Sequence, residues 1–159
     1  MTRTRLAVAC AAALALPFAL PADEKEPPFK LSADEKAVVE FTNAERKKAE
    51  LPPLAANPKL TAAARGHAAN MAKQDKLEHT LDDKKFDDRI TAAGYKFAAA
   101  GENIAWNPAT PKEVVAGWMD SPPHKANIEN KDFTEIGVAV AKNEKGEPYW
   151  VQVFGKPLE

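Results

Sequence analysis

The chain has 159 residues, of which 22 are Lys or Arg, 23 are Asp or Glu, three are His and one is Cys, and 45% are hydrophobic. A formal net charge of −1 does not indicate a nucleic-acid-binding protein, because such a protein typically carries a basic surface. The length, together with 28% charged residues, is typical of one globular domain with its own hydrophobic core and not of a disordered chain.

The N-terminal segment has the pattern of a secretory signal peptide. It contains Arg3 and Arg5 and no acidic residue, and an apolar run over residues 6–20 follows them. This run is short for a bilayer span and contains a proline, so we predict a signal peptide over residues 1–22 that is cleaved after Ala22. An uncleaved N-terminal anchor is the alternative. We therefore expect a secreted or extracytoplasmic protein, in the periplasm or at the cell surface, without a stable transmembrane segment.

The single cysteine, Cys10, lies within the predicted signal peptide. A lipoprotein anchored through Cys10 is a weaker interpretation, because too little hydrophobic sequence precedes this residue. Residues 23–159 contain no cysteine, which excludes both a disulfide and a zinc site built on thiolates in the mature domain. We expect the hydrophobic core alone to hold this domain together.

The next segments have the periodicity and the end signals of helices. Residues 23–33 are charged and contain two prolines, and we interpret them as a linker to a domain over residues 34–159. Ser32 and Thr110 each precede a glutamate by three residues, the spacing of a capping box, and Asn57 followed by proline is a typical helix start. We predict helices from Ser32 to about Ala49, from Asn57 to about Asp75, over 83–93, from Thr110 through Trp118, and a short helix or turn that starts at Ser121 and carries His124.

The C-terminal part has the alternation of strands. Apolar residues alternate over 135–141 and again over 149–154, and a turn from Asn143 to Gly146 separates the two runs, which predicts an antiparallel hairpin. A third strand is expected over residues 97–105. Helices followed by a small antiparallel sheet predict an α+β domain in which helices cover the sheet.

Histidine is the side chain most able to carry chemistry here, because it titrates near neutral pH and binds metals. His67 lies on an Ala-rich helical face, so we interpret it as a packing or partly exposed residue. His79 and His124 lie where elements end, and Glu102 lies in an otherwise apolar stretch where a carboxylate needs a partner. The sequence contains no standard hydrolase or phosphate-binding motif. Spacing alone does not favour one shared site, because the three residues are more than 20 positions apart.

We expect structural rather than ligand-binding roles for two asparagines and three tryptophans. We expect Asn103 and Asn127 to hydrogen-bond loop backbone. The three tryptophans are expected to pack in the core or on the sheet rather than to bind a substrate: Trp106, Trp118 and Trp150.

Four blocks of sequence together resemble the CAP superfamily, which comprises the cysteine-rich secretory, antigen five and pathogenesis-related-one proteins and is also called the SCP domain. The blocks are His79-Thr80 after an Ala-rich helix, Gly-Glu-Asn-Ile-Ala from Gly101, Trp-Met-Asp-Ser-Pro-Pro-His-Lys-Ala-Asn-Ile from Trp118 and Glu-Ile-Gly-Val-Ala from Glu135. The resemblance covers about residues 34–155, and the chain resembles the short, cysteine-free bacterial form. Arg89 resembles a structural residue of bacterial members, and we expect it to form a salt bridge with Glu102 or Asp88.

This resemblance implies an α-β-α sandwich with a surface cleft lined by two histidines and two acidic residues, which in some members binds zinc or another divalent cation. His79, Glu102 and His124 fall on three of these four positions. At the fourth, Ser121 stands with Asp120 beside it, so either Asp120 substitutes or the site has only three candidate ligands. Glu135, the first residue of the fourth block, is a further acid expected near the cleft, but it matches none of the four positions.

The candidate metal ligands are therefore the imidazoles of His79 and His124. Glu102 either joins them as a ligand or orients one ring by accepting its other N–H. With two nitrogen ligands, we expect zinc or another divalent cation to bind weakly and in a pH-dependent manner.

Three functions follow from this set of residues. The favoured one is a secreted or cell-surface binding module whose cleft takes a divalent cation, a lipid or a peptide; the cleft residues are His79, Glu102, Asp120, Ser121 and His124. The alternative is a metal-dependent or His-assisted, protease-like hydrolase with His79 or His124 as general base. A purely structural role for the polar residues is the third. A nucleophile pair of Ser121 and His124 is disfavoured, because we expect the Ser121 hydroxyl to cap a helix.

Overall fold

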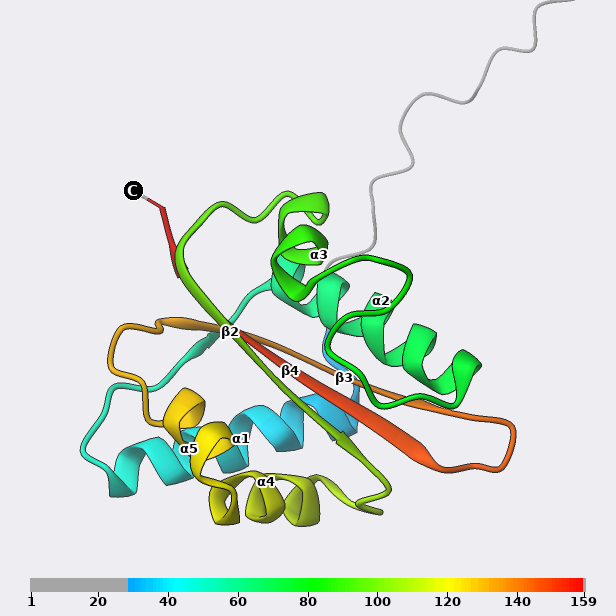
Figure 1. Cartoon of the computed structure of the whole chain (residues 1–159). Helices are drawn as coiled ribbons and strands as arrows, with labels where there is room; N and C mark the ends of the chain where they lie inside the picture. Colours follow the sequence, from blue (N-terminus) through cyan, green and yellow to red (C-terminus); the bar gives the residue numbers. More distant parts are fainter. Residues whose placement is uncertain (1–28, 159) are drawn as a thin grey trace, which may run out of the picture.

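The computed structural model describes residues 29–158, so the predicted signal peptide and most of the predicted linker lie outside the described residues. The described part forms five helices and four strands, arranged as a sheet with helices on both faces (Figure 1). The elements are α1 (Ala33–Lys48), β1 (Ala55–Ala56), α2 (Pro58–Gln74), α3 (Phe86–Ala92), β2 (Phe97–Trp106), α4 (Pro111–Asp120), α5 (Pro122–Ile128), β3 (Glu135–Lys142) and β4 (Pro148–Pro157). The expectation of an α+β domain with a covered sheet is confirmed.

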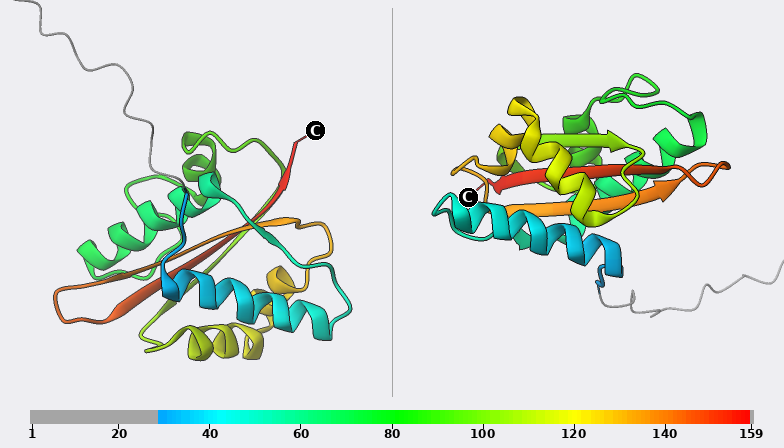
Figure 2. Two further views of the ribbon diagram at one scale, coloured as in Figure 1. Left: turned by 180° about the vertical axis from the view of Figure 1, so that it is seen from behind. Right: turned by 90° about the horizontal axis from the view of Figure 1, so that it is seen from below.

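The sheet has the strand order β1-β3-β4-β2. Helices α1, α4 and α5 cover one face, and α2 and α3 cover the other, as the two views of Figure 2 show. Each face has its own hydrophobic core: Met71, Ile90 and Val151 belong to the α2 side, while Trp118 and Phe154 belong to the α1 side. Among the described residues, no helix is long and apolar enough to cross a membrane.

The helix ends follow the local sequence signals. Ser32 and Thr110 form the predicted capping boxes, each accepting from the backbone of the glutamate three residues on, whose carboxylate accepts from the cap residue's N–H. Asn57 accepts from the first N–H groups of α2, and Asp75, in the left-handed conformation, ends this helix. The predicted ends of the first two helices are therefore correct to within about one residue.

The predicted helix over 83–93 starts too early, because the helix begins only at Phe86. Asp82 and Asp83 both have positive φ angles, 52° and 57°, which no residue within an α-helix adopts. They form a tight turn in which the Lys84 N–H donates to the Leu81 carbonyl at 3.0 Å. This turn fixes the loop in front of α3, and the loop carries part of the site described below.

The predicted hairpin of β3 and β4 is confirmed, with Ile136 opposite Phe154. Strand β2 pairs with β4 and is an edge strand, and both α4 and α5 contact it. Trp118 Nε1 donates to the Ile104 carbonyl at 3.2 Å, and Asn127 Nδ2 donates to the Glu102 carbonyl at 3.3 Å. These bonds satisfy carbonyls that an open edge would expose, and they place α5 beside Glu102.

The three tryptophans do not share one environment. Trp118 and Trp150 are buried, as expected, and each donates its indole N–H to a backbone carbonyl. Trp106 is 46% exposed, so the expectation that it packs in the core or on the sheet is wrong. It is the last residue of β2.

A buried arginine joins distant segments on the α1 side. Arg46, near the end of α1, is 1% exposed and has no acidic partner among the described residues. Its guanidinium donates to the carbonyls of Pro52 at 2.9 Å, Ile128 and Asn130 at 2.8 Å each, and Phe133 at 3.2 Å. Burial lowers the pKa of Arg46. The side chain thereby fastens the loop after α1 and the segment that follows α5 to α1.

Candidate functional site

Glu102 is the centre of the polar site. It lies on β2 with a side chain that is 2% exposed, and both of its carboxylate oxygens accept hydrogen bonds. His79 Nδ1 donates to Oε1 at 2.9 Å, and Arg89 Nη2 donates to Oε2 at 2.6 Å. A buried carboxylate is tolerated when it is paired and hydrogen-bonded in this way. Glu102 therefore holds the His79 ring by a hydrogen bond, and its own two oxygens are already engaged.

Arg89 holds this arrangement from helix α3. Besides Glu102, its guanidinium donates to the carbonyls of His79 and Lys84, both at 2.9 Å. Of the two partners expected for Arg89, the structure shows Glu102, while Asp88 accepts from the backbone of Lys85. One arginine thus fixes both the carboxylate and the loop that carries His79.

His79 has one ring nitrogen that its contact with Glu102 leaves free. Because a carboxylate can only accept, Nδ1 carries the proton that is shared with Glu102, and Nε2 of the neutral ring is an acceptor. The His79 side chain is 53% exposed, so about half of the surface of this side chain is accessible to solvent. A carboxylate that holds one imidazole nitrogen while the other is free is the usual support for a metal-binding or proton-accepting histidine.

His124 is the second histidine of the candidate site, and another element carries it. It lies on α5, is half-buried, and its backbone carbonyl accepts from Asn103 of β2 at 3.1 Å. Burial lowers the pKa of His124, and charge on the nearby His79 lowers it further. The His124 ring is therefore neutral at neutral pH, the form in which it can bind a cation.

The two asparagines have a role that sequence reasoning missed. Asn103 is fully buried and bonds to Gln152 of the neighbouring strand at 3.0 Å, while Asn127 donates to the Asn103 side chain at 2.8 Å. Gln152 continues the chain of bonds to Thr42 of α1 at 2.7 Å. Both amides donate to backbone carbonyls, as expected, but these carbonyls belong to α5 and β2 and not to a loop, so the two side chains fasten α5 to the sheet. A glutamine between valines in a strand was the signal that could have shown this network.

His67 lies beneath the same site and is 1% exposed. Its Nε2–H donates to the Glu78 carbonyl at 2.9 Å, and Nδ1 has no hydrogen-bond partner. Burial lowers the pKa of His67; nearby Glu102 partly opposes this effect, and charge on Arg89 adds to it. The interpretation of His67 as a packing residue agrees with this burial, and its bond to Glu78 also holds the loop in front of His79.

The remaining candidates do not join this cluster. Asp120 ends α4 and is exposed, and among the described residues it makes no ion pair or hydrogen bond with the cleft histidines. The expected capping by Ser121 is wrong, because its hydroxyl makes no capping bond at α5. Glu135 instead accepts from the Tyr95 hydroxyl and from Asn57.

The donor set limits which metal could be held. The part of the chain that the structure describes contains no cluster of three or more His, Cys, Asp or Glu side chains arranged to bind a metal ion. Since both oxygens of Glu102 are hydrogen-bonded, one to His79 and one to Arg89, the imidazoles of His79 and His124 remain as nitrogen ligands. Catalytic zinc usually has three protein ligands. The residues present therefore fit a weakly held cation completed by water, and not a catalytic zinc centre.

Comparisons with known proteins agree with one another. The family model described as "CAP: Cysteine-rich secretory protein family" matches residues 39–154. The uncharacterized protein YkwD of Bacillus subtilis is 40% identical over 131 residues, which is 81% of this chain and 50% of that protein. The chain thus spans about half the length of this relative.

Solved structures share the fold. An outer surface protein of Borrelia burgdorferi superposes with a TM-score of 0.75 at 26% identity, covering 82% of this chain and 97% of that one. An extracellular protein of Bacillus anthracis that contains an SCP domain gives 0.71 at 27% identity, covering 77% and 40%. A more distant structure, NaASP2 solved with Zn²⁺, gives 0.56 at 15% identity, covering 82% and 83%, and shows the common fold alone.

Proposed function

The chain belongs to the CAP, or cysteine-rich secretory protein, family, and on that premise we propose that it is the ligand-binding CAP domain of a secreted or cell-surface protein. The outer surface and extracellular proteins with the same fold support this location. The observation that carries the proposal is the pairing of His79 with the buried Glu102, which leaves the other ring nitrogen of His79 free, with His124 nearby.

The ligand that this geometry supports best is a divalent cation held by the two imidazoles. Nε2 of His79 and the neutral ring of His124 would supply the protein donors, and water would complete the coordination. Glu102 and Arg89 orient His79, so they raise affinity without touching the cation. A lipid or a peptide in the same cleft is the other class of ligand expected from the sequence.

Zinc titration by calorimetry tests the cation. We expect saturable binding at pH 7.5 and weaker binding at pH 5.5, because protons compete for the imidazoles. His79→Ala and His124→Ala should each abolish the binding heat, and Glu102→Gln should weaken affinity by about tenfold or more through the loss of ring orientation.

His67→Gln is the matched control, since it removes the third histidine of the chain and keeps an N–H donor for the Glu78 carbonyl. It should bind zinc as the wild type does. Absence of binding heat in the wild type, or unchanged heat in both the His79 and His124 variants, would contradict the cation proposal.

Hydrolysis is a second candidate, and the observation that favours it is the same hydrogen bond from His79 to Glu102. A histidine oriented by a carboxylate can act as a general base towards water. Within residues 29–158, no hydroxyl side chain bonds to His79 or His124, so the nucleophile would be water. Turnover of a peptide or ester library should fall by at least about a hundredfold in His79→Ala. Turnover that survives this substitution would exclude the mechanism.

A further inference from the structure

The loop that carries His79 makes a sharp turn three residues further on, at Asp82 and Asp83. These two residues have positive φ angles, 52° and 57°, and the Lys84 N–H donates to the Leu81 carbonyl at 3.0 Å across the turn. Two successive positive φ angles are the signature of a type I′ turn, and they cost conformational free energy for residues other than glycine. Such backbone persists only where surrounding contacts hold it, and it is often found at functional sites. The contacts that hold this turn therefore bear on the site to which His79 belongs.

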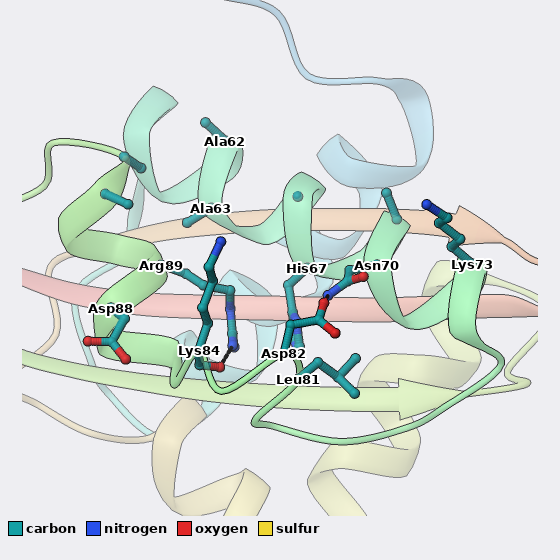
Figure 3. Close-up of a pocket in the computed structure, with 14 residues that line it drawn as sticks. Ala62, Ala63, His67, Asn70, Lys73, Leu81, Asp82, Lys84, Asp88 and Arg89 are labelled. Atoms are coloured by element: carbon teal, nitrogen blue, oxygen red, sulfur yellow. Dashed lines mark hydrogen bonds between the residues drawn. The ribbon is translucent and has the colours of Figure 1, made fainter.

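Asp82 makes these contacts through its carboxylate, with two amides of α2. Asn70 Nδ2 donates to Asp82 Oδ2 at 2.9 Å, and Gln74 Nε2 donates to both carboxylate oxygens at 3.1 Å each. Gln74 also donates to Asn70 Oδ1 at 3.0 Å, so the two amides hold each other in place. Figure 3 shows the Asp82 side chain directed from the loop towards Asn70. Asp83 is exposed, and in the part of the chain that the structure describes its carboxylate makes neither a hydrogen bond nor an ion pair.

Arg89 holds the same loop from α3. Its guanidinium donates to the carbonyls of His79 and Lys84 at 2.9 Å each, and the bond to Lys84 is drawn in Figure 3. Between these two points Leu81 is 5% exposed and packs in the core on the α2 side. The loop is thus fastened to α3 at both ends and to α2 in the middle, at Asp82. A displacement of Asp82 would reach His79 through only three residues of backbone.

We propose that Asp82 is a positioning residue for His79. Its hydrogen bonds to Asn70 and Gln74 hold the loop in the conformation in which His79 Nδ1 donates to Glu102. The inference rests on the proposed function, because it assigns the free nitrogen of His79 to the cation. A ring that is already held in its binding orientation loses less conformational freedom when it binds a ligand, so the Asp82 contacts raise affinity without touching the cation.

Asp82→Gly and Asp83→Gly form a matched pair. Glycine adopts positive φ readily, so both variants keep the turn, and only Asp82→Gly removes hydrogen bonds. In the metal-free protein at pH 7.5, nitrogen-15 NMR should show His79 protonated at Nδ1 in the wild type and in Asp83→Gly, because Glu102 accepts that proton. Asp82→Gly should give a mixture of the two ring tautomers.

Zinc calorimetry on the same two variants measures the consequence for affinity. The Kd should rise about tenfold in Asp82→Gly, the lower end of the effect of side chains that support a metal ligand. In Asp83→Gly it should stay within about twofold of the wild type, as for a surface substitution.

Exchange of the two partners tests whether their hydrogen bond matters. Asn70→Asp alone places two carboxylates in contact, so it should displace the loop and raise the zinc Kd by about tenfold. The double variant Asn70→Asp, Asp82→Asn restores an amide donor opposite a carboxylate, and Gln74 can still donate to that carboxylate. It should return the Kd to within about twofold of the wild type.

Three results would overturn the proposal: an unchanged His79 tautomer and zinc Kd in Asp82→Gly, an equal change in Asp83→Gly, or a double variant that does not recover what Asn70→Asp loses. A wild type that binds no zinc contradicts the proposed function instead. The tautomer of His79 in the metal-free variants then still decides whether Asp82 positions this ring.

Discussion

Replacement of Arg46 by methionine is expected to lower the free energy of unfolding by about 3–5 kcal/mol. The guanidinium donates to four backbone carbonyls, and two of these bonds, to Ile128 and Phe133, are buried. Methionine fills part of the space but offers no donor, so the buried carbonyls would lose their partners. Urea denaturation followed by circular dichroism measures the difference.

The control for this substitution lies one residue along the same helix. Lys47 is exposed, and Lys47→Met makes the same change to a long aliphatic side chain without removing a buried donor. It should alter stability by less than about 0.5 kcal/mol. If Arg46→Met falls within this range as well, the hydrogen bonds of Arg46 do not contribute to stability as proposed.

Gly137→Ala is expected to have an effect at least as large, with a loss above about 4 kcal/mol or no folded protein at all. Gly137 lies on β3 directly beneath the first turn of α2, and a Cβ there would overlap the backbone of Leu60 and Thr61. A side chain can change its rotamer to relieve an overlap, but helix backbone can yield only if α2 moves off the sheet. Thermal unfolding and soluble yield measure the outcome.

The same substitution at Gly117 provides the comparison. Gly117 lies within α4 with nothing within 4 Å of its Cβ position, so alanine there should stabilise the helix by about 0.5–1 kcal/mol. Two glycine-to-alanine variants with opposite effects would separate the steric requirement at Gly137 from a general effect of glycine. A Gly137→Ala protein that unfolds at the wild-type temperature would show that α2 does not pack this closely on β3.

Sequence patterns were sufficient for features whose causes are local. Both capping boxes depend on residues three positions apart, and the hairpin of β3 and β4 depends on alternation around a turn, so each is visible in a short window. The resemblance to the CAP superfamily also rested on short blocks of sequence, and the family match over residues 39–154 and the structural likenesses confirm the family and the layered fold.

Features that depend on contacts across the fold were harder to predict. The two-residue strand β1 has no β pattern and exists because it lies beside β3. Asp82 and Asp83 adopt left-handed conformations, so the helix that was predicted from Asp83 begins only at Phe86. These cases were decided by tertiary packing and turn geometry, which local propensity does not contain.

The candidate site also has some features that the sequence predicted and others that it did not. Motifs pointed to Glu102, a pairing with Arg89 was expected and His67 was interpreted as a packing residue, but the burial of Asn103 beside Glu102 was not expected. The expected capping role of Ser121 failed because the chain passes directly from α4 into α5. The roles of His79 and His124 as cation ligands stay predictions that the zinc titration tests.

Arg46 also bears on how this domain is assembled. Three of its hydrogen bonds are to Ile128, Asn130 and Phe133, which lie 82, 84 and 87 positions after Arg46 in the sequence. Extracellular domains often join such distant segments by a disulfide. The described residues contain no cysteine, so the connection between α1 and the segment at the C-terminal end of α5 is made by a protonated side chain. Such a tie forms without an oxidase and cannot be reduced or shuffled into a wrong pairing. The fold can therefore be completed in a reducing or an oxidising compartment alike.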